Sequence, residues 1–247
     1  MKNKILSFVL AICLIIPCAL MFAGCNDKEP KDNAIYVDSA TELATAIADA
    51  KAEDVIKLNA NIDLTNTITI TNTVTINLNG KTLTQTNTED DYSMFIIDAE
   101  GILTIEGEGI VNSATQANDY SMAVWAKNGG KAIINGGTFT NVGAKDFEDD
   151  DTTPNNNELI YASANGEIII NGGAFIGNTE NERWGTRYTL NKKDGSNGQI
   201  IVKGGTFKEF NPAESLSENP QANFVADGYT VGSTEVEGAT WYTVVAE

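Results

Sequence analysis

The feature of this sequence that most constrains its fold is a repeated unit of about thirty residues. Residues 132–139, 168–175 and 200–207 share one pattern: three apolar residues, a polar residue, Gly-Gly, a small residue and Phe. Shorter forms of this pattern end at Gly80 and Gly107, so the spacing between units runs from 27 to 36 residues. Between these markers no segment has sustained helical periodicity. The repeat therefore predicts stacked units made of strands.

Each unit reads as strand, turn, strand, Gly-Gly turn, short strand and polar loop. Such a unit cannot bury its apolar stripe alone, but units stacked about 4.8 Å apart form a continuous core. We therefore expect an all-β fold, a single-stranded solenoid whose Gly-Gly corners adopt positive φ. Phe139, Phe175 and Phe207 are expected to stack, and Asn135 to hydrogen-bond to Asn171. A propeller is the alternative, but its blades usually take about 40 residues or more.

The start of the repeat region adds a helix. Ser39 and Glu42 form a capping-box pair, and apolar residues such as Leu43 and Ile47 line one face, which predicts a helix over 39–51. The string from this helix to Ile76-Asn77-Leu78-Asn79-Gly80 resembles the opening of right-handed parallel β-helix proteins of the pectate-lyase-like superfamily. The resemblance implies a right-handed β-helix over 35–210 with the helix covering its N-terminal end. That superfamily holds lyases, hydrolases, adhesins and inert scaffolds, so the resemblance implies an architecture and not an activity.

The last part of the chain departs from the repeat. We expect residues 211–247 to form a C-terminal cap that covers the lower end of the solenoid. Residues 211–216 read as one helical turn, with proline at its first position. Residues 225–231 and 241–245 read as two strands that pair as a hairpin.

The first residues read as an export address. Two lysines precede an apolar run, and the run ends in Phe22-Ala23-Gly24-Cys25, which resembles the lipobox of bacterial lipoproteins. The resemblance implies a signal peptide over 1–24, a lipid on Cys25, and a lipidated tether over 25–34 on the outer face of a bacterial membrane. An uncleaved transmembrane anchor is the alternative, since the run is about long enough to span a bilayer. Either interpretation places the rest of the chain outside the cytoplasm.

Charge and composition exclude several classes of function. The chain has no histidine and a formal net charge of −18, and removal of the signal leaves 14 cations against 34 acids, a charge of −20. Nucleic-acid phosphates would be repelled by such a body. Catalysis by imidazole and zinc sites that need histidine are excluded. We expect a monomer whose membrane contact runs through the lipid alone.

Candidate site residues lie in the polar loops, which recur at the same place in successive repeats, at 85–93, 113–121, 141–158 and 178–188. The candidates for ligand binding combine aromatic and charged groups, as sugar sites do: Tyr92, Tyr120, Glu182, Arg183, Trp184 and Arg187. The two tyrosines belong to a four-residue string, Asp-Tyr-Ser-Met, that recurs 28 residues later. Weak candidates for calcium are Asp149, Asp150 and Asp151, although no spaced Asp-x-Asp-x-Asp-Gly pattern is present. Solvated or packed loops are the alternative throughout.

These observations favour a non-catalytic, membrane-tethered extracytoplasmic β-helix that contacts glycan or protein through its acidic loop face. No cofactor is expected. A polysaccharide lyase or glycoside hydrolase of the pectate-lyase-like superfamily is the first alternative. The resemblance implies that such enzymes carry their paired aspartates on strands, whereas the paired aspartates of this chain lie in polar loops. A purely structural cell-envelope or adhesin element is the second.

Overall fold

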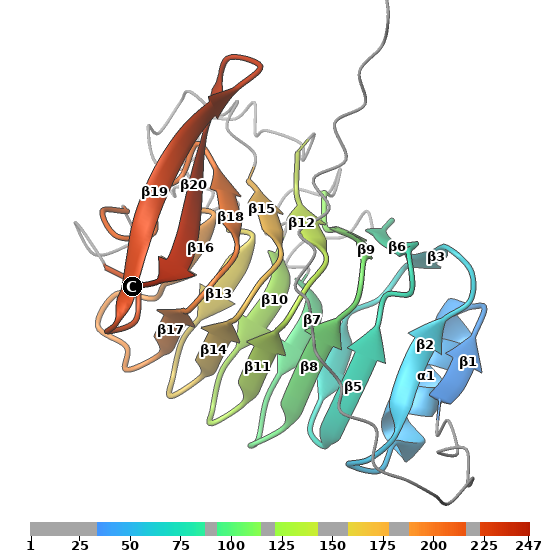
Figure 1. Cartoon of the computed structure of the whole chain (residues 1–247). Coiled ribbons are helices and arrows are strands. Elements are labelled where there is room, and N and C mark those ends of the chain that lie inside the picture. The colour runs from blue at the N-terminus through green and yellow to red at the C-terminus, as the bar shows by residue number, and fades with distance from the viewer. Residues whose placement is uncertain (1–33, 87–92, 115–121, 143–157, 178–187, 216–222) are drawn as a thin grey trace, which may run out of the picture. The chain divides into compact units, whose positions relative to one another are not determined.

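The structure is a computed structural model that describes residues 34–86, 93–114, 122–142, 158–177, 188–215 and 223–247. All of them belong to one compact unit, Asn33–Glu247. Within these residues the fold is mostly β, with one helix and three sheets in which parallel pairing dominates (Figure 1). This arrangement is compatible with an all-β solenoid.

The strands of the three sheets follow in spatial order. Sheet A holds β1 (Ala34–Val37), β2 (Val55–Leu58), β5 (Thr73–Asn77), β8 (Ile102–Glu106), β11 (Lys131–Ile134), β14 (Glu167–Ile170) and β17 (Gln199–Val202). Sheet B holds β3 (Ile62–Leu64), β6 (Lys81–Gln85), β9 (Gly109–Asn112), β12 (Thr138–Thr140), β15 (Ala174–Ile176), β18 (Thr206–Lys208), β20 (Ala239–Ala246) and β19 (Tyr229–Val236). Sheet C holds β4 (Ile68–Ile70), β7 (Ser93–Ile97), β10 (Met122–Ala126), β13 (Ile160–Ala162) and β16 (Leu190–Lys192).

From β2 to β18 the chain visits sheets A, B and C in strict rotation. Each strand therefore pairs in parallel with the strand three elements further on, so one repeat contributes one strand to each sheet. Alternating residues point inward, and the inward ones are aliphatic or aromatic, as in the fully buried column that contains Ile76, Ile105, Ile134 and Ile170. The core lies between the three sheets as one continuous cluster.

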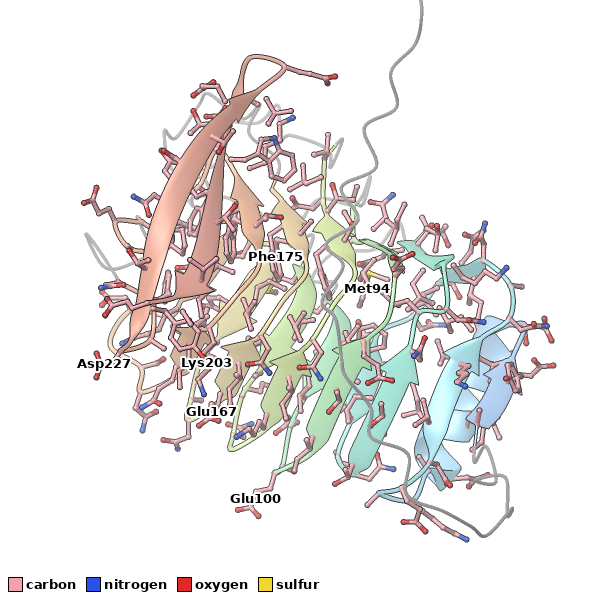
Figure 2. The ribbon with its side chains drawn as sticks, in the orientation of Figure 1. Met94, Glu100, Glu167, Phe175, Lys203 and Asp227 are labelled. Carbon is pink, nitrogen blue, oxygen red and sulfur yellow. The ribbon has the colours of Figure 1, made fainter. Side chains whose placement is uncertain are left out.

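The expected phenylalanine ladder is present. The ring of Phe175 stacks on Phe139 with centroids 5.2 Å apart and planes 10° from parallel, and on Phe207 at 4.9 Å and 11°. All three side chains are fully buried, and Figure 2 shows Phe175 within the stack of strands while Glu100 lies at a turn on its edge. The expected asparagine contact is also present, since Asn171 Nδ2 donates to Asn135 Oδ1 at 2.9 Å.

The Gly-Gly corners are required for two separate reasons. The second glycine has positive φ, 89° at Gly137 and 103° at Gly173. The first glycine lies against the preceding repeat: a Cβ on Gly172 would stand 2.9 Å from Asn135 O, and one on Gly204 would stand 2.2 Å from Asn171 O. Stacked backbones therefore leave no room for a side chain at these corners.

The helix predicted over 39–51 is α1 (Ala40–Asp49), whose buried residues include Leu43 and Ile47. Ser39 is its N-cap and accepts a hydrogen bond from Glu42 N at 3.3 Å. The Glu42 carboxylate accepts from Asp38 N at 2.7 Å, one residue before the amide that a capping box uses. In Figure 1 α1 lies beside β1 and β2, at the N-terminal end of the stacked strands.

The C-terminal segment contains the expected hairpin with different bounds: its first strand begins at Tyr229 and not at residue 225, and both strands have eight residues. Strands β19 and β20 pair antiparallel from Tyr229↔Ala246 to Val236↔Ala239, and β20 adds antiparallel to β18 at the end of sheet B. Of the single capped turn expected over 211–216, the described residues 211–215 form a hydrogen-bonded turn and no regular helix. There Asn211 O accepts from Glu214 N at 3.2 Å and Asn211 Oδ1 accepts from Ala213 N at 3.1 Å, so the side chain of Asn211 stabilises an isolated turn.

The strand register between β7 and β10 differs by one residue from the offset at which the sequence repeats. Ser93 pairs with Met122, an offset of 29 residues, whereas the identical strings recur at an offset of 28. Inward packing of Phe95 beside Val124 sets this register, because a shift by one residue would exchange the inward and outward faces.

Candidate functional site

The candidate residues from the sequence lie outside the described part of the chain. This holds for the lipidation candidate, the ligand-binding candidates and the calcium candidates: Cys25, Tyr92, Tyr120, Glu182, Arg183, Trp184, Arg187, Asp149, Asp150 and Asp151. The structure therefore brings none of them together and separates none of them. What it does describe is the set of strand ends from which the four loop segments start and to which they return.

Those strand ends are aligned. The loop segments follow β6, β9, β12 and β15, which are neighbours in sheet B, and they precede β7, β10, β13 and β16, which are neighbours in sheet C. Most of the buried polar side chains in the described ranges lie at these ends: Gln85, Ser93, Ser113, Asn141, Glu158 and Thr189. The carboxylate of Glu158 accepts from Asn191 Nδ2 at 2.8 Å, and both residues are buried. The four loop segments thus begin and end along one row of strand ends that carries buried polar side chains.

The outward face of sheet C carries an aromatic pair whose contacts are made within the protein. Trp125 and Tyr161 are register partners with ring centroids 5.8 Å apart. The indole N–H donates to Ser163 Oγ at 2.8 Å, and Lys127 Nζ lies over the indole ring, 4.4 Å from its centroid. Because its donor and one ring face are already in use, Trp125 offers little to a ligand.

Lys127 also belongs to a small polar cluster formed by the turns that follow β7 and β10. Asp98 accepts from Asn128 Nδ2 at 2.9 Å and lies 3.6 Å from Lys127 Nζ. The hydrogen bond from Asn128 is the main cause that holds the pKa of the Asp98 carboxyl below its ordinary value, and desolvation opposes it. The backbone amide of Ala99 and the charge of Lys127 lower this pKa further.

A groove with ligand-binding chemistry lies on the outward face of sheet B, where the hairpin β19–β20 extends past the end of β18. We call it the hairpin groove; its volume is about 480 Å³, within the range of ligand sites. Its lining residues are Ala174, Thr206, Lys208, Val236, Glu237, Ala239 and Trp241. The first three come from the sheet, and the others come from the hairpin.

The local pairing explains how these groups meet. Lys208 on β18 is the register partner of Trp241 on β20, so both side chains point to the same outward face. Glu237 stands in the two-residue turn of the hairpin, with φ of 53°, and is exposed. Among the described residues, no ion pair engages Lys208 or Glu237, and the half-buried indole of Trp241 has no hydrogen-bond partner. The groove thus holds an indole, an ammonium and a carboxylate that are available to a ligand.

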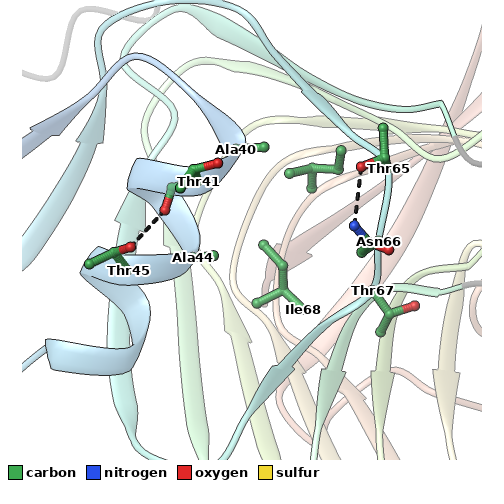
Figure 3. A pocket seen from close by; sticks show the side chains of 9 residues that line it. Ala40, Thr41, Ala44, Thr45, Thr65, Asn66, Thr67 and Ile68 are labelled. Atoms are coloured by element: carbon green, nitrogen blue, oxygen red, sulfur yellow. Dashed lines mark hydrogen bonds between the residues drawn. The ribbon is translucent and has the colours of Figure 1, made fainter.

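A second pocket, of about 320 Å³, lies between α1 and the segment from Leu64 to Ile68 (Figure 3). Its lining consists of aliphatic side chains, threonines and one asparagine. Two of its polar groups bond locally: Thr45 Oγ1 donates to Thr41 O, and Asn66 Nδ2 donates to Thr65 Oγ1. Among the residues that the structure describes, no aromatic or charged side chain lines this pocket. The hairpin groove is therefore the stronger candidate.

Sequence reasoning missed the groove, although two signals point to it. The turn Glu237-Gly238 separates two alternating runs and predicts a longer hairpin than one that starts at Trp241. Lys208 occupies the position that Thr140 and Ile176 take in the two preceding repeats, so it places a charge where those repeats have none. Both signals become informative only once the eight-residue strands of the hairpin are set beside the three residues of β18.

No known protein family matches this chain, and no curated protein or solved structure matches it either. In the described ranges no helix is both long and apolar enough to cross a bilayer. Within those same ranges, no three His, Cys, Asp or Glu side chains are grouped so that they could hold a metal ion.

Proposed function

We propose that this chain is a lipid-anchored, extracytoplasmic right-handed parallel β-helix that binds a short uncharged glycan in the hairpin groove without cleaving it. The anchor is the lipid on Cys25, and the site of action is the outer face of a bacterial membrane. The observation that carries the binding function is the available indole of Trp241 beside Lys208 and Glu237 in one open groove.

The strict rotation through three parallel sheets supports the β-helix. Each step from a strand to its parallel neighbour is a crossover, and crossovers of this kind are right-handed in about 98% of cases. The stacked Phe139, Phe175 and Phe207 support coils of one strand spacing, because their centroids stand 4.9–5.2 Å apart.

The chemistry of the groove supports a sugar of no net charge. An indole face packs against the C–H face of a pyranose, while hydroxyl groups hydrogen-bond to charged and hydroxyl side chains. Lys208 and Glu237 cancel each other, and Thr206 adds a neutral donor and acceptor. A polyanion would meet the −20 charge of the exported chain, which disfavours it.

The same lining supports binding over cleavage. Glycosidases place two carboxyl groups across the scissile bond. The residues that line the hairpin groove include one carboxylate, Glu237. A polysaccharide lyase or hydrolase therefore remains the alternative that the product assay below must detect. The aligned loop ends favour a further contact surface on the loop side, for which Trp184 is the residue to vary.

The test is a titration of the fragment Asn26–Glu247, which holds every described element, with neutral oligosaccharides and with oligogalacturonate as the charged comparator. Binding is read from tryptophan fluorescence and calorimetry, and products are read as new reducing ends or unsaturated ends. Trp241→Ala is expected to weaken binding of the neutral sugar at least about tenfold, the loss for roughly 1.4 kcal/mol.

Trp125→Phe is the matched control, because Lys127 and Ser163 already occupy its indole, and it should bind like the parent. Unchanged binding in Trp241→Ala would remove the site from the hairpin groove, and loss in Trp184→Ala instead would move it to the loop side. Product formation would establish an enzyme. No binding to any neutral sugar would leave the structural role.

A further inference from the structure

Strand β19 is the one long open edge among the described strands. The six terminal strands of the three sheets are β1, β17, β3, β19, β4 and β16. Five of them are three or four residues long, and β17 is also bridged at Val202 by Val225. Strand β19 has eight residues, pairs on one side with β20, and has no described strand on its other side. Short edge strands do not template new pairing, but an edge of eight residues does.

The hairpin geometry identifies the backbone groups that face this edge. Val236 and Ala239 flank a two-residue turn, so they exchange hydrogen bonds with each other. Hydrogen-bonded positions alternate along an antiparallel pair. The amides and carbonyls of Val231, Ser233 and Glu235 therefore point away from β20, toward the open edge. The carbonyl of Tyr229 points the same way, while its amide donates to Ala226 O at 3.2 Å in the preceding turn.

Nothing in the sequence of β19 blocks this edge. The strand contains no lysine, arginine or proline, which are the residues that protect exposed edges. Glu235 is its one charged residue, and the side chains from Gly232 to Val236 are exposed. Val236 on this strand and Val245 on its partner are 48% and 49% exposed, which adds apolar surface on both strands of the hairpin.

We infer that β19 pairs with β19 of a second copy of this chain, antiparallel and about a twofold axis at Gly232. Continuation of the sheet with the same face outward requires odd residues opposite odd residues, and this axis satisfies that condition. Tyr229 then faces Glu235 of the partner copy and Val231 faces Ser233, so the three open-edge amides and the carbonyl of Tyr229 are used. The two Glu235 carboxylates stand at opposite ends of the ribbon. This dimer replaces the monomer expected from the sequence, and it is independent of the hairpin groove.

Charge makes the association dependent on salt. Each exported chain carries a net charge of −20, and the repulsion between two such bodies is screened as ionic strength rises. The dimer is therefore expected to be tighter in 0.5 M than in 0.05 M salt, opposite to an interface held by ion pairs.

The experiment measures mass by sedimentation, on the full chain in detergent micelles and on Asn26–Glu247. The parent and Ser233→Ala are expected to form dimers, because both keep the amide at position 233. Ser233→Pro removes this open-edge N–H and no hairpin hydrogen bond, and is expected to weaken association at least about tenfold. Circular dichroism checks that the variant folds. A parent that stays monomeric at high micromolar concentration and high salt, or a folded Ser233→Pro that dimerises like the parent, overturns the inference.

A crosslink keeps the test decisive if Ser233→Pro does not fold. Gly232→Cys, in a Cys25→Ser background, places two thiols on the twofold axis in a non-hydrogen-bonded pair, where Cα atoms are about 4.5 Å apart and a disulfide fits. A Cβ at Gly232 meets nothing within 4 Å, so the substitution is sterically free. Thr230→Cys lies on the same face and strand but opposite Thr234 of the partner, and should give no crosslink. Equal crosslinking of the two variants contradicts the proposed register, and no crosslink from Gly232→Cys contradicts the dimer.

Discussion

The phenylalanine ladder predicts a stability cost that a buried phenylalanine outside the ladder does not have. Phe175 is fully buried between two stacked rings, at 5.2 Å from Phe139 and 4.9 Å from Phe207. Phe95 in sheet C is also fully buried, but no described aromatic ring stacks on it. The pair Phe175→Ala and Phe95→Ala therefore compares equal burial with and without stacking.

The magnitude follows from two contributions. Truncation of a buried phenylalanine costs about 3–5 kcal/mol through lost transfer energy and a residual cavity. Each stacked pair adds about 0.5–1.5 kcal/mol beyond burial. Phe175→Ala breaks two such pairs, so it should destabilise the protein by about 1–3 kcal/mol more than Phe95→Ala. Because the free energy of unfolding of a typical domain is about 5–15 kcal/mol, both variants must be measured at low temperature, where they stay folded.

Urea unfolding followed by circular dichroism gives the free energy of unfolding of each variant, and equal m-values verify that the same unit unfolds. Phe175→Leu restores most of the volume without the ring and should recover the cavity cost while it keeps the stacking loss. If Phe175→Ala and Phe95→Ala destabilise equally within about 0.5 kcal/mol, stacking adds nothing and the ladder stabilises through burial alone.

Two further predictions concern the turns between sheets C and A. Gly130→Ala should destabilise the fold by several kcal/mol, because its Cβ would stand 2.2 Å from Ile97 O, whereas Gly195→Ala has open space and should cost only about 1–2 kcal/mol for its positive φ; similar melting temperatures for the two variants would contradict the steric argument. The folded-state pKa of Asp98 is depressed, so its ionised form contributes stability that is present above the pKa of the unfolded chain and is lost as pH falls through the folded pKa. In an NMR titration Asn128→Ala should therefore raise the pKa of Asp98 toward its ordinary value. An unchanged pKa would show that the hydrogen bond from Asn128 is not the main cause of the depression.

Contacts between residues at equivalent positions of the repeat could be predicted from the sequence, and other contacts could not. The stacking of Phe139 on Phe175 and the contact between Asn135 and Asn171 were predictable, because equivalent positions in stacked repeats must be neighbours. The register at Ser93 was not, since identical letters recur one residue away from the pairing that buries Phe95.

The hairpin groove could not be predicted for a different reason. Trp241 and Lys208 are 33 residues apart and share no repeat, so they meet only because β20 adds antiparallel to β18. This pairing is set by the three-dimensional fold and not by a local sequence pattern. The polar loops illustrate the opposite case: their common origin was readable from equivalent positions, and the aligned ends of β6, β9, β12 and β15 agree with it.

The exact parallel register between β11 and β14 has a consequence for how such a chain changes length during evolution. Ile134 lies beside Ile170, and both are followed by Asn-Gly-Gly. Loss of residues 135–170 would join Ile134 directly to Asn171, so the same corner would continue into the same next strand. A gene can therefore gain or lose one whole layer by unequal recombination at these short identical stretches, with the N-terminal helix and the C-terminal hairpin carried along unchanged. The number of layers in the stack can therefore change during evolution while the helix and the hairpin at its two ends stay the same.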